Sequence, residues 1–122
     1  LDSNQAVGDM ISDGLNKNII TLNTSKNVYR GYMNADDMVN WLIVILKKSN
    51  KNCPIFNVGS DKAINLRLLG KKIAKIFNKK IKLKKLNNLD TDYYVPSITK
   101  ARKILKMKIS INLNDSLISF IK

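Results

Sequence analysis

Arg30 is the side chain in this sequence with the clearest chemical use. It stands between a β-rich segment, residues 28–33, and the acidic start of a helix at Asp36 and Asp37. A guanidinium group offers paired N–H donors in a fork that matches two phosphate oxygens. Arg30 is therefore a candidate ligand for an anion, and the alternative is a surface arginine at a strand end.

The neighbouring carboxylates of Asp36 and Asp37 also have two interpretations. Two acids side by side suggest general acid–base chemistry. Acids in the first turn of a helix, however, complement the positive end of its dipole. Asn34 precedes Asp37 by three residues, as in a capping box with shortened acids. The position at a helix start favours the structural interpretation.

Other chemically active residues are few. Cys53 is the only cysteine, which rules out an internal disulfide and favours a reducing, cytoplasmic compartment. One cysteine and no histidine leave few ligands for a transition metal, so we expect no metal site. No apolar stretch reaches the ~18 residues that suggest a membrane span.

The elements that must position these residues alternate along the chain. Alternating helices and short strands predict an α/β fold, or an α+β fold if these 122 residues are taken alone. We expect one single region over residues 1–122. The second helix is apolar almost all round and should be buried on more than one side. The periodicity predicts helices over 4–16, 34–48, a segment capped by Asn65, 98–105 and a segment from Asn112. Strands are predicted over 19–22, 28–33, 55–58 and 81–86, and a polar loop over 87–92 leads to an extended segment over 93–95.

The net charge of +13 raises the possibility of a nucleic-acid partner. Between residues 61 and 86, ten lysines and arginines accompany one acid. Lysine dominates, whereas direct base recognition favours the arginine fork. A solvated lysine surface is the main interpretation, and a small basic module for nucleic acid or another anionic partner is the alternative.

Four sequence blocks, in order, resemble the C-terminal half of extended short-chain dehydrogenases/reductases, the NAD-dependent nucleotide-sugar epimerases and dehydratases. They are YRGYMNADDM (29–38), FNVGS with INL (56–66), YVPSITKARKIL (94–105) and the final helix. The resemblance implies a substrate-binding region of several helices and a few short strands, with most of the Rossmann core absent. The strands near 28–33 and 55–58 would then belong with a Rossmann sheet outside these 122 residues.

The resemblance also implies site residues. Arg30 would grip the diphosphate of a UDP-, dTDP- or CDP-sugar, and the backbone around Leu22 would run beside the base. Asn87 takes the place of a second arginine in a loop where Asp90 matches the family. Asp9 would face the sugar nucleotide, although a plain first-turn helix acid is an equal alternative.

The catalytic signatures of that family are not in this sequence. The five glycines never take the Gly-x-x-Gly-x-x-Gly spacing of the cofactor turn, and no tyrosine is followed four residues later by lysine. We therefore expect a C-terminal fragment that neither binds a dinucleotide nor catalyses by itself. The parent would use NAD or NADP, form a homodimer and act as an isomerase or lyase in deoxysugar biosynthesis.

Overall fold

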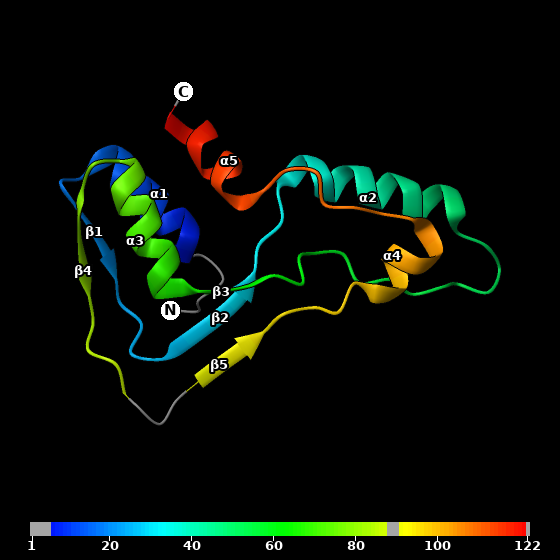
Figure 1. Ribbon diagram of the computed structural model, residues 1–122, viewed down its shortest axis with the longest axis horizontal. Helices are drawn as coiled ribbons and strands as arrows, with labels where there is room; N and C mark the ends of the chain where they lie inside the picture. The colour runs from blue at the N-terminus through cyan, green and yellow to red at the C-terminus, as the bar shows by residue number, and fades with distance from the viewer. Residues whose placement is uncertain (1–5, 88–90, 122) are drawn as a thin grey trace.

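The computed structural model describes residues 6–87 and 91–121, and these residues have an α+β architecture (Figure 1). The helices are α1 (Ala6–Asn16), α2 (Ala35–Lys48), α3 (Leu66–Ile76), α4 (Thr99–Leu105) and α5 (Leu113–Ile118), which continues into a 3₁₀ turn (Ser119–Ile121). The strands are β1 (Ile19–Leu22), β2 (Asn27–Gly31), β3 (Ala63–Asn65), β4 (Lys80–Leu83) and β5 (Thr91–Tyr94). The predicted fold class, several helices with a few short strands, is confirmed.

The strands form two separate small sheets. β1 pairs with β4 in parallel, with Ile20 opposite Ile81. In the second sheet β2 is central, antiparallel to β3 and parallel to β5. Arg30 lies opposite Ile64 on one side and Tyr94 on the other. Both edges of β2 are thus occupied by strands of the described chain, so any further strand would have to join this sheet through β3 or β5.

One hydrophobic cluster joins α1, α3 and the strands beside them. Helix α3 begins as predicted, because the Asn65 side chain accepts hydrogen bonds from the N–H groups of Arg67 and Leu68. Its apolar stripe packs into a core with α1 and the first sheet. The buried members are Met10, Ile20, Leu22, Val28, Leu66, Leu69, Ile73, Ala74 and Leu117.

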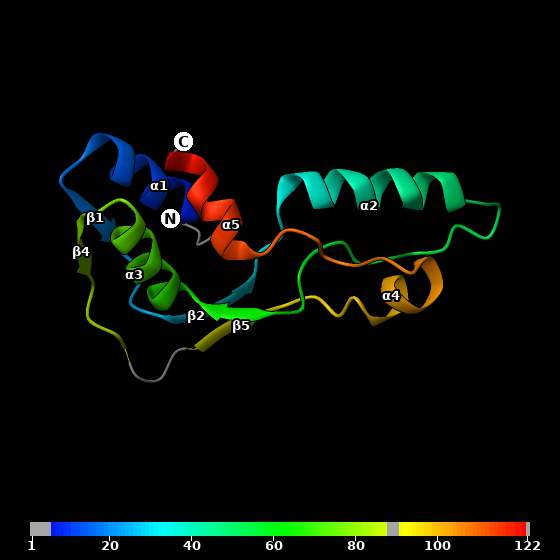
Figure 2. The same ribbon diagram turned by 45° about the horizontal axis from the view of Figure 1, so that its top comes forward.

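A second cluster surrounds Trp41 at the other end of the molecule, where α2 and α4 lie (Figures 1 and 2). Trp41 is buried with Ile98 and Ala101, and its indole N–H donates to the Lys108 carbonyl at 3.1 Å. Phe56 also packs against this cluster. An indole that is buried and also hydrogen-bonded fixes the inner side of α2.

The expectation that α2 is buried on more than one side is wrong for this chain. Its inner side carries Trp41 and Asp37, whereas the neighbouring apolar side chains stand 43–73% exposed. We call these residues the α2 apolar face: Met38, Val39, Leu42, Ile43 and Leu46. A helix this apolar has more hydrophobic surface than the described residues can cover.

The strand assignments differ more from expectation than the helices do. Residues 55–58 were predicted to be a strand, but they have no regular secondary structure and belong to neither sheet of the described chain. Three-residue β3 was not predicted, and β5 starts at Thr91, inside the segment expected to be a loop. Of the described helices, none is both long and apolar enough to cross a membrane.

Candidate functional site

A cavity of about 830 Å³ collects predicted site residues. It is lined by α1, β1 and the turn that leads into β2, and one residue of β5, Asp92, also lines it. Leu22 and Asp9 both line it. Two residues predicted to contact a nucleotide sugar are thus brought together from separate elements.

The remaining predicted residues stand at different distances from this cavity. Asn87 does not line it, but its backbone N–H donates to the carbonyl of Ser25, a lining residue, at 2.7 Å. Asp90 lies outside the described residues. Arg30 does not line the cavity itself, but it is hydrogen-bonded to Asp92, which does.

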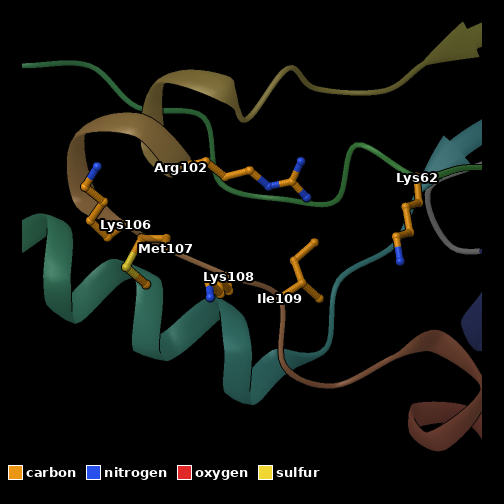
Figure 3. A pocket seen from close by; sticks show the side chains of 6 residues that line it. All are labelled: Lys62, Arg102, Lys106, Met107, Lys108 and Ile109. Carbon is orange, nitrogen blue, oxygen red and sulfur yellow. The ribbon is translucent and has the colours of Figure 1, made fainter.

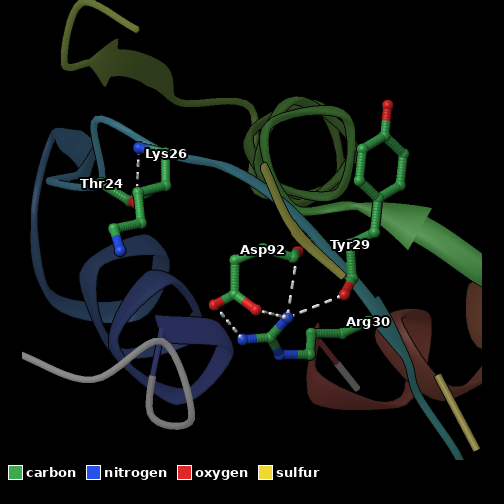
Figure 4. Close-up of polar contacts among 5 residues, drawn as sticks. All are labelled: Thr24, Lys26, Tyr29, Arg30 and Asp92. Atoms are coloured by element: carbon green, nitrogen blue, oxygen red, sulfur yellow. Dashed lines mark hydrogen bonds and ion pairs between the residues drawn. The ribbon is translucent and has the colours of Figure 1, made fainter. Parts of the chain in front are cut away.

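Arg30 makes a dense set of polar contacts (Figure 4). Its Nη2 donates to Oδ2 of Asp92 at 2.6 Å, and Nη1 donates to Oδ1 at 3.1 Å. Nη1 also donates to the carbonyls of Tyr29 at 2.9 Å and Asp92 at 3.2 Å. The Arg30 side chain is only 14% exposed. The bidentate fork expected for a phosphate is therefore formed here with a carboxylate.

The pair perturbs both members. Hydrogen bonding to Asp92 raises the pKa of Arg30 above its ordinary value. Hydrogen bonds from Arg30 are the main cause that lowers the pKa of Asp92, and the charge of Lys26 lowers it further. Both groups are thus ionised at neutral pH.

Sequence reasoning missed Asp92. It falls in a segment expected to be a polar loop, whereas the structure places it in β5 opposite Val28. Two residues on, Tyr94 lies opposite Arg30, so Asp92 and Arg30 are diagonal neighbours on parallel strands. Only the β2–β5 register, which no local pattern shows, could have revealed this contact.

Asp13 holds the junction between α1 and β1 beside the same cavity. Its carboxylate pairs with Lys17 at 2.7 Å and accepts from the N–H of Thr21 at 3.0 Å. The hydrogen bond from Lys17 is the largest cause that lowers the pKa of Asp13. These contacts give Asp13 a structural role.

The two acids at the start of α2 lie in different environments. Asp37 is buried and accepts from the side chain and N–H of Ser110 and from the N–H of Ile111 at 2.9 Å. Asp36 is exposed, and its N–H is capped by Asn34 at 2.8 Å. The capping box is therefore incomplete. Asn34 caps the helix, but the Asp37 carboxylate binds Ser110 and Ile111 and so anchors the segment that leads to α5.

A second cavity, of about 380 Å³, lies near α4 and is strongly basic (Figure 3). Its lining consists of two apolar residues, Met107 and Ile109, and four cations: Lys62, Arg102, Lys106 and Lys108. Arg102 is bound to Asp61 by two hydrogen bonds of 2.5 and 3.0 Å. This cavity is the place in the described chain where the alternative of a basic binding module has its best support.

Comparison with solved structures finds the same fold in nucleotide-sugar enzymes. UDP-N-acetylglucosamine 4-epimerase from Bacillus cereus matches with a TM-score of 0.75 and 21% identity, over 98% of this chain. UDP-glucose 4-epimerase from Thermotoga maritima matches with 0.74 and 18%, over 95%. An NAD-dependent NDP-hexosamine 5,6-dehydratase of tunicamycin biosynthesis matches with 0.71 and 15%, over 95%. Neither the protein-family models nor the curated protein sequences give a match.

The matches cover only part of those enzymes. This chain corresponds to 42%, 37% and 38% of the three solved chains. The resemblance predicted from the sequence is confirmed at the level of the fold: the chain folds like one part of an NAD-dependent nucleotide-sugar epimerase or dehydratase, an extended short-chain dehydrogenase/reductase.

Proposed function

We propose that this chain is the substrate-binding portion of an NAD(P)-dependent nucleotide-sugar epimerase or 4,6-dehydratase. It binds the nucleotide diphosphate and shapes the sugar pocket, and it does not catalyse by itself. The observation that carries the proposal is the 830 Å³ cavity, whose lining gathers Asp9 of α1, Leu22 of β1 and Asp92 of β5, the ion-pair partner of Arg30.

The polar lining of this cavity suits a ligand with many hydroxyl groups beside a charged group. Asp9, Ser12 and Thr24 offer acceptors and donors of the kind that sugars bind, and Lys26 adds a cation. Leu22 supplies an apolar wall beside which a flat base can lie. The ligand chemistry that these groups favour is a phosphorylated sugar nucleotide.

The residues present do not fit the dinucleotide cofactor. Close approach of a pyrophosphate needs glycines that are open to the ligand. Four of the five glycines instead face protein atoms, because a Cβ on any of them would lie within 3.0 Å of a neighbouring residue. These glycines are Gly14, Gly31, Gly59 and Gly70. Gly8 is open, but it lies inside α1. A hydride acceptor would therefore be held by the remainder of the enzyme.

That remainder has a natural place to dock on the α2 apolar face. The solved chains are more than twice as long as the part that this chain matches. The α2 apolar face is exposed here, and residues 55–58 belong to no sheet of the described chain, with Ile55 79% exposed. We assign this surface to the nucleotide-binding part of the enzyme, which would bury the face and supply the neighbour that 55–58 lacks.

A direct test compares ligands by calorimetric titration. The proposal expects saturable binding of at least one of UDP-, dTDP- and CDP-glucose, with little change between roughly 50 and 200 mM salt. Arg30→Ala should weaken that binding about tenfold or more, because a hydrogen-bonded charge partner is lost. Arg102→Ala is the matched control, since it removes an arginine from the other cavity and should leave nucleotide-sugar binding unchanged.

The second candidate function predicts the opposite pattern. A basic module would bind an oligonucleotide with a steep loss of affinity over the same salt range, because counterions are released on binding. Arg102→Ala would weaken this binding and Arg30→Ala would not. Binding to oligonucleotide alone, with no nucleotide-sugar binding, would replace the first function by the second.

A further inference from the structure

Arg30 is already paired, because the Asp92 carboxylate accepts hydrogen bonds from both arms of its guanidinium group. Both carboxylate oxygens of Asp92 accept from it, at 2.6 and 3.1 Å. A diphosphate bound by this arginine would need the same donors, since a carboxylate and a phosphate each present a pair of oxygen acceptors to the guanidinium fork. Carboxylate and ligand phosphate therefore compete for one group.

The competition between Asp92 and a ligand phosphate follows from the pairing of strands β2 and β5. Asp92 and Arg30 are diagonal neighbours on the paired strands β5 and β2, which holds the two side chains together. The Asp92 carbonyl also accepts from Nη1 of Arg30, so the main chain as well as the side chain of Asp92 faces the arginine. Asp92 lines the cavity and its side chain is 42% exposed. The carboxylate thus lies between the arginine and the space where a ligand would bind.

We propose that Asp92 determines the affinity of the cavity for phosphate-bearing ligands, because a ligand phosphate must displace its carboxylate from Arg30. This inference rests on the proposed function, since it takes the ligand to be a nucleotide diphosphate. Lys26 lines the same cavity, and its charge already acts on Asp92.

The size of the effect follows from population arithmetic. If Arg30 accepts a phosphate only when Asp92 has moved away, the apparent affinity falls by the fraction of molecules in that state. Partly exposed ion pairs with bidentate geometry are of modest strength. Removing the charge of Asp92 should therefore tighten phosphate binding about three- to tenfold.

The experiment titrates UDP-glucose and inorganic pyrophosphate into the wild-type chain and two variants. Asp92→Asn keeps the shape of the side chain and removes its charge, and Asp92→Ser is a second variant if the amide disturbs folding. Asp61→Asn is the matched control, because Asp61 holds Arg102 in the same bidentate way at the other cavity. The double variant Arg30→Ala/Asp92→Asn shows whether the gain passes through Arg30.

Each outcome decides the inference. Tighter binding by Asp92→Asn, unchanged binding by Asp61→Asn and loss of the gain in the double variant support it. Equal or weaker binding by Asp92→Asn, with wild-type binding of UDP-glucose intact, overturns it and leaves the proposed function standing. Pyrophosphate binding that tightens in Asp92→Asn while no variant binds a nucleotide sugar supports the inference and removes the proposed function. No binding of either ligand to wild type or Asp92→Asn overturns both.

Discussion

At the residue scale, Gly31 fixes the close approach between the end of β2 and the loop before β3. A Cβ at this position would lie 1.9 Å from the backbone oxygen of Ser60, and a backbone atom cannot move aside as a flexible side chain can. Gly31→Ala should destabilise the chain by about 2 kcal/mol or more through this overlap. The measurement is urea unfolding at equilibrium.

Gly8 provides the control for this prediction. It lies inside α1 with nothing within 4 Å of its would-be Cβ. Alanine has the higher helix propensity, so Gly8→Ala should stabilise the chain by about 0.5–1 kcal/mol. Equal effects at Gly31 and Gly8 would show that the Ser60 backbone is not packed against Gly31.

Asp37 should make stability depend on pH. Burial opposes its ionisation, but hydrogen bonds from the side chain of Ser110 and the N–H groups of Ile111 and Ser110 outweigh it and lower its pKa. A lowered folded-state pKa stabilises the fold above the unfolded value of about 3.9, and this stabilisation is lost as the pH falls through the folded value. Asp37→Asn should therefore cost roughly 1–3 kcal/mol at pH 7 and progressively less below pH ~4.

The control for Asp37 is its neighbour. Asp36 is exposed in the same helical turn, and Asp36→Asn should change the free energy of unfolding by less than about 0.5 kcal/mol. Urea titrations of both variants over a pH series provide the comparison. A cost for Asp37→Asn that stays constant into the acid range would contradict ionised Asp37 as the anchor.

Only those residues of the candidate site that lie in a local sequence motif could be predicted. Arg30 and Leu22 were found because their surroundings resemble a known pattern, and the structure puts Leu22 on the cavity wall. Asp92 could not be found, because its contact with Arg30 depends on the register between strands more than 60 residues apart in sequence. Charge partners across a sheet are set by pairing, and pairing is a non-local property.

At the element scale, the helices and the strands β1, β2 and β4 were predicted, whereas β3 and the start of β5 were not. The starts of α2, α3 and α5 carry the caps Asn34, Asn65 and Asn112, which act within a few residues. Strand β3 is three residues long and exists only because β2 runs beside it. The apolar run 55–58 was expected to be a strand, but an extended segment becomes one only where a neighbour accepts its hydrogen bonds.

The orientation of α2 can be tested with two adjacent residues. Trp41 is 1% exposed and Leu42 is 50% exposed. Trp41→Ala should destabilise the chain by about 3–5 kcal/mol because it empties the second cluster, whereas Leu42→Ala should cost less than about 1 kcal/mol. Urea unfolding of both variants measures the difference. Similar costs for both would mean that the chain by itself covers both sides of α2.

At the scale of the whole molecule, the two clusters are unequally covered. The cluster between α1 and α3 is enclosed by helices and a sheet, whereas α2 and α4 extend away from it with little around them (Figures 1 and 2). The chain matches about two fifths of longer enzymes. Under the proposed function, the remainder of such an enzyme would bury the α2 apolar face, and this would account for the asymmetry. Composition alone could not show it, since the exposed and buried residues of α2 are of the same apolar kinds.

An exposed face of this kind should make the chain associate with itself when its nucleotide-binding complement is absent. Sedimentation velocity at increasing concentration should show reversible self-association. Salt should promote it, because screening weakens the repulsion of a +13 charge. The double variant Leu42→Gln/Leu46→Gln removes two side chains that are 50% and 73% exposed on the α2 apolar face, and should weaken association at least about tenfold.

Leu68→Gln is the control for this prediction. It changes a side chain that is 57% exposed on α3 and should leave association unchanged. If both variants reduced association equally, the contact would be general hydrophobic adhesion, and the assignment of the α2 apolar face as the docking surface would lose its support.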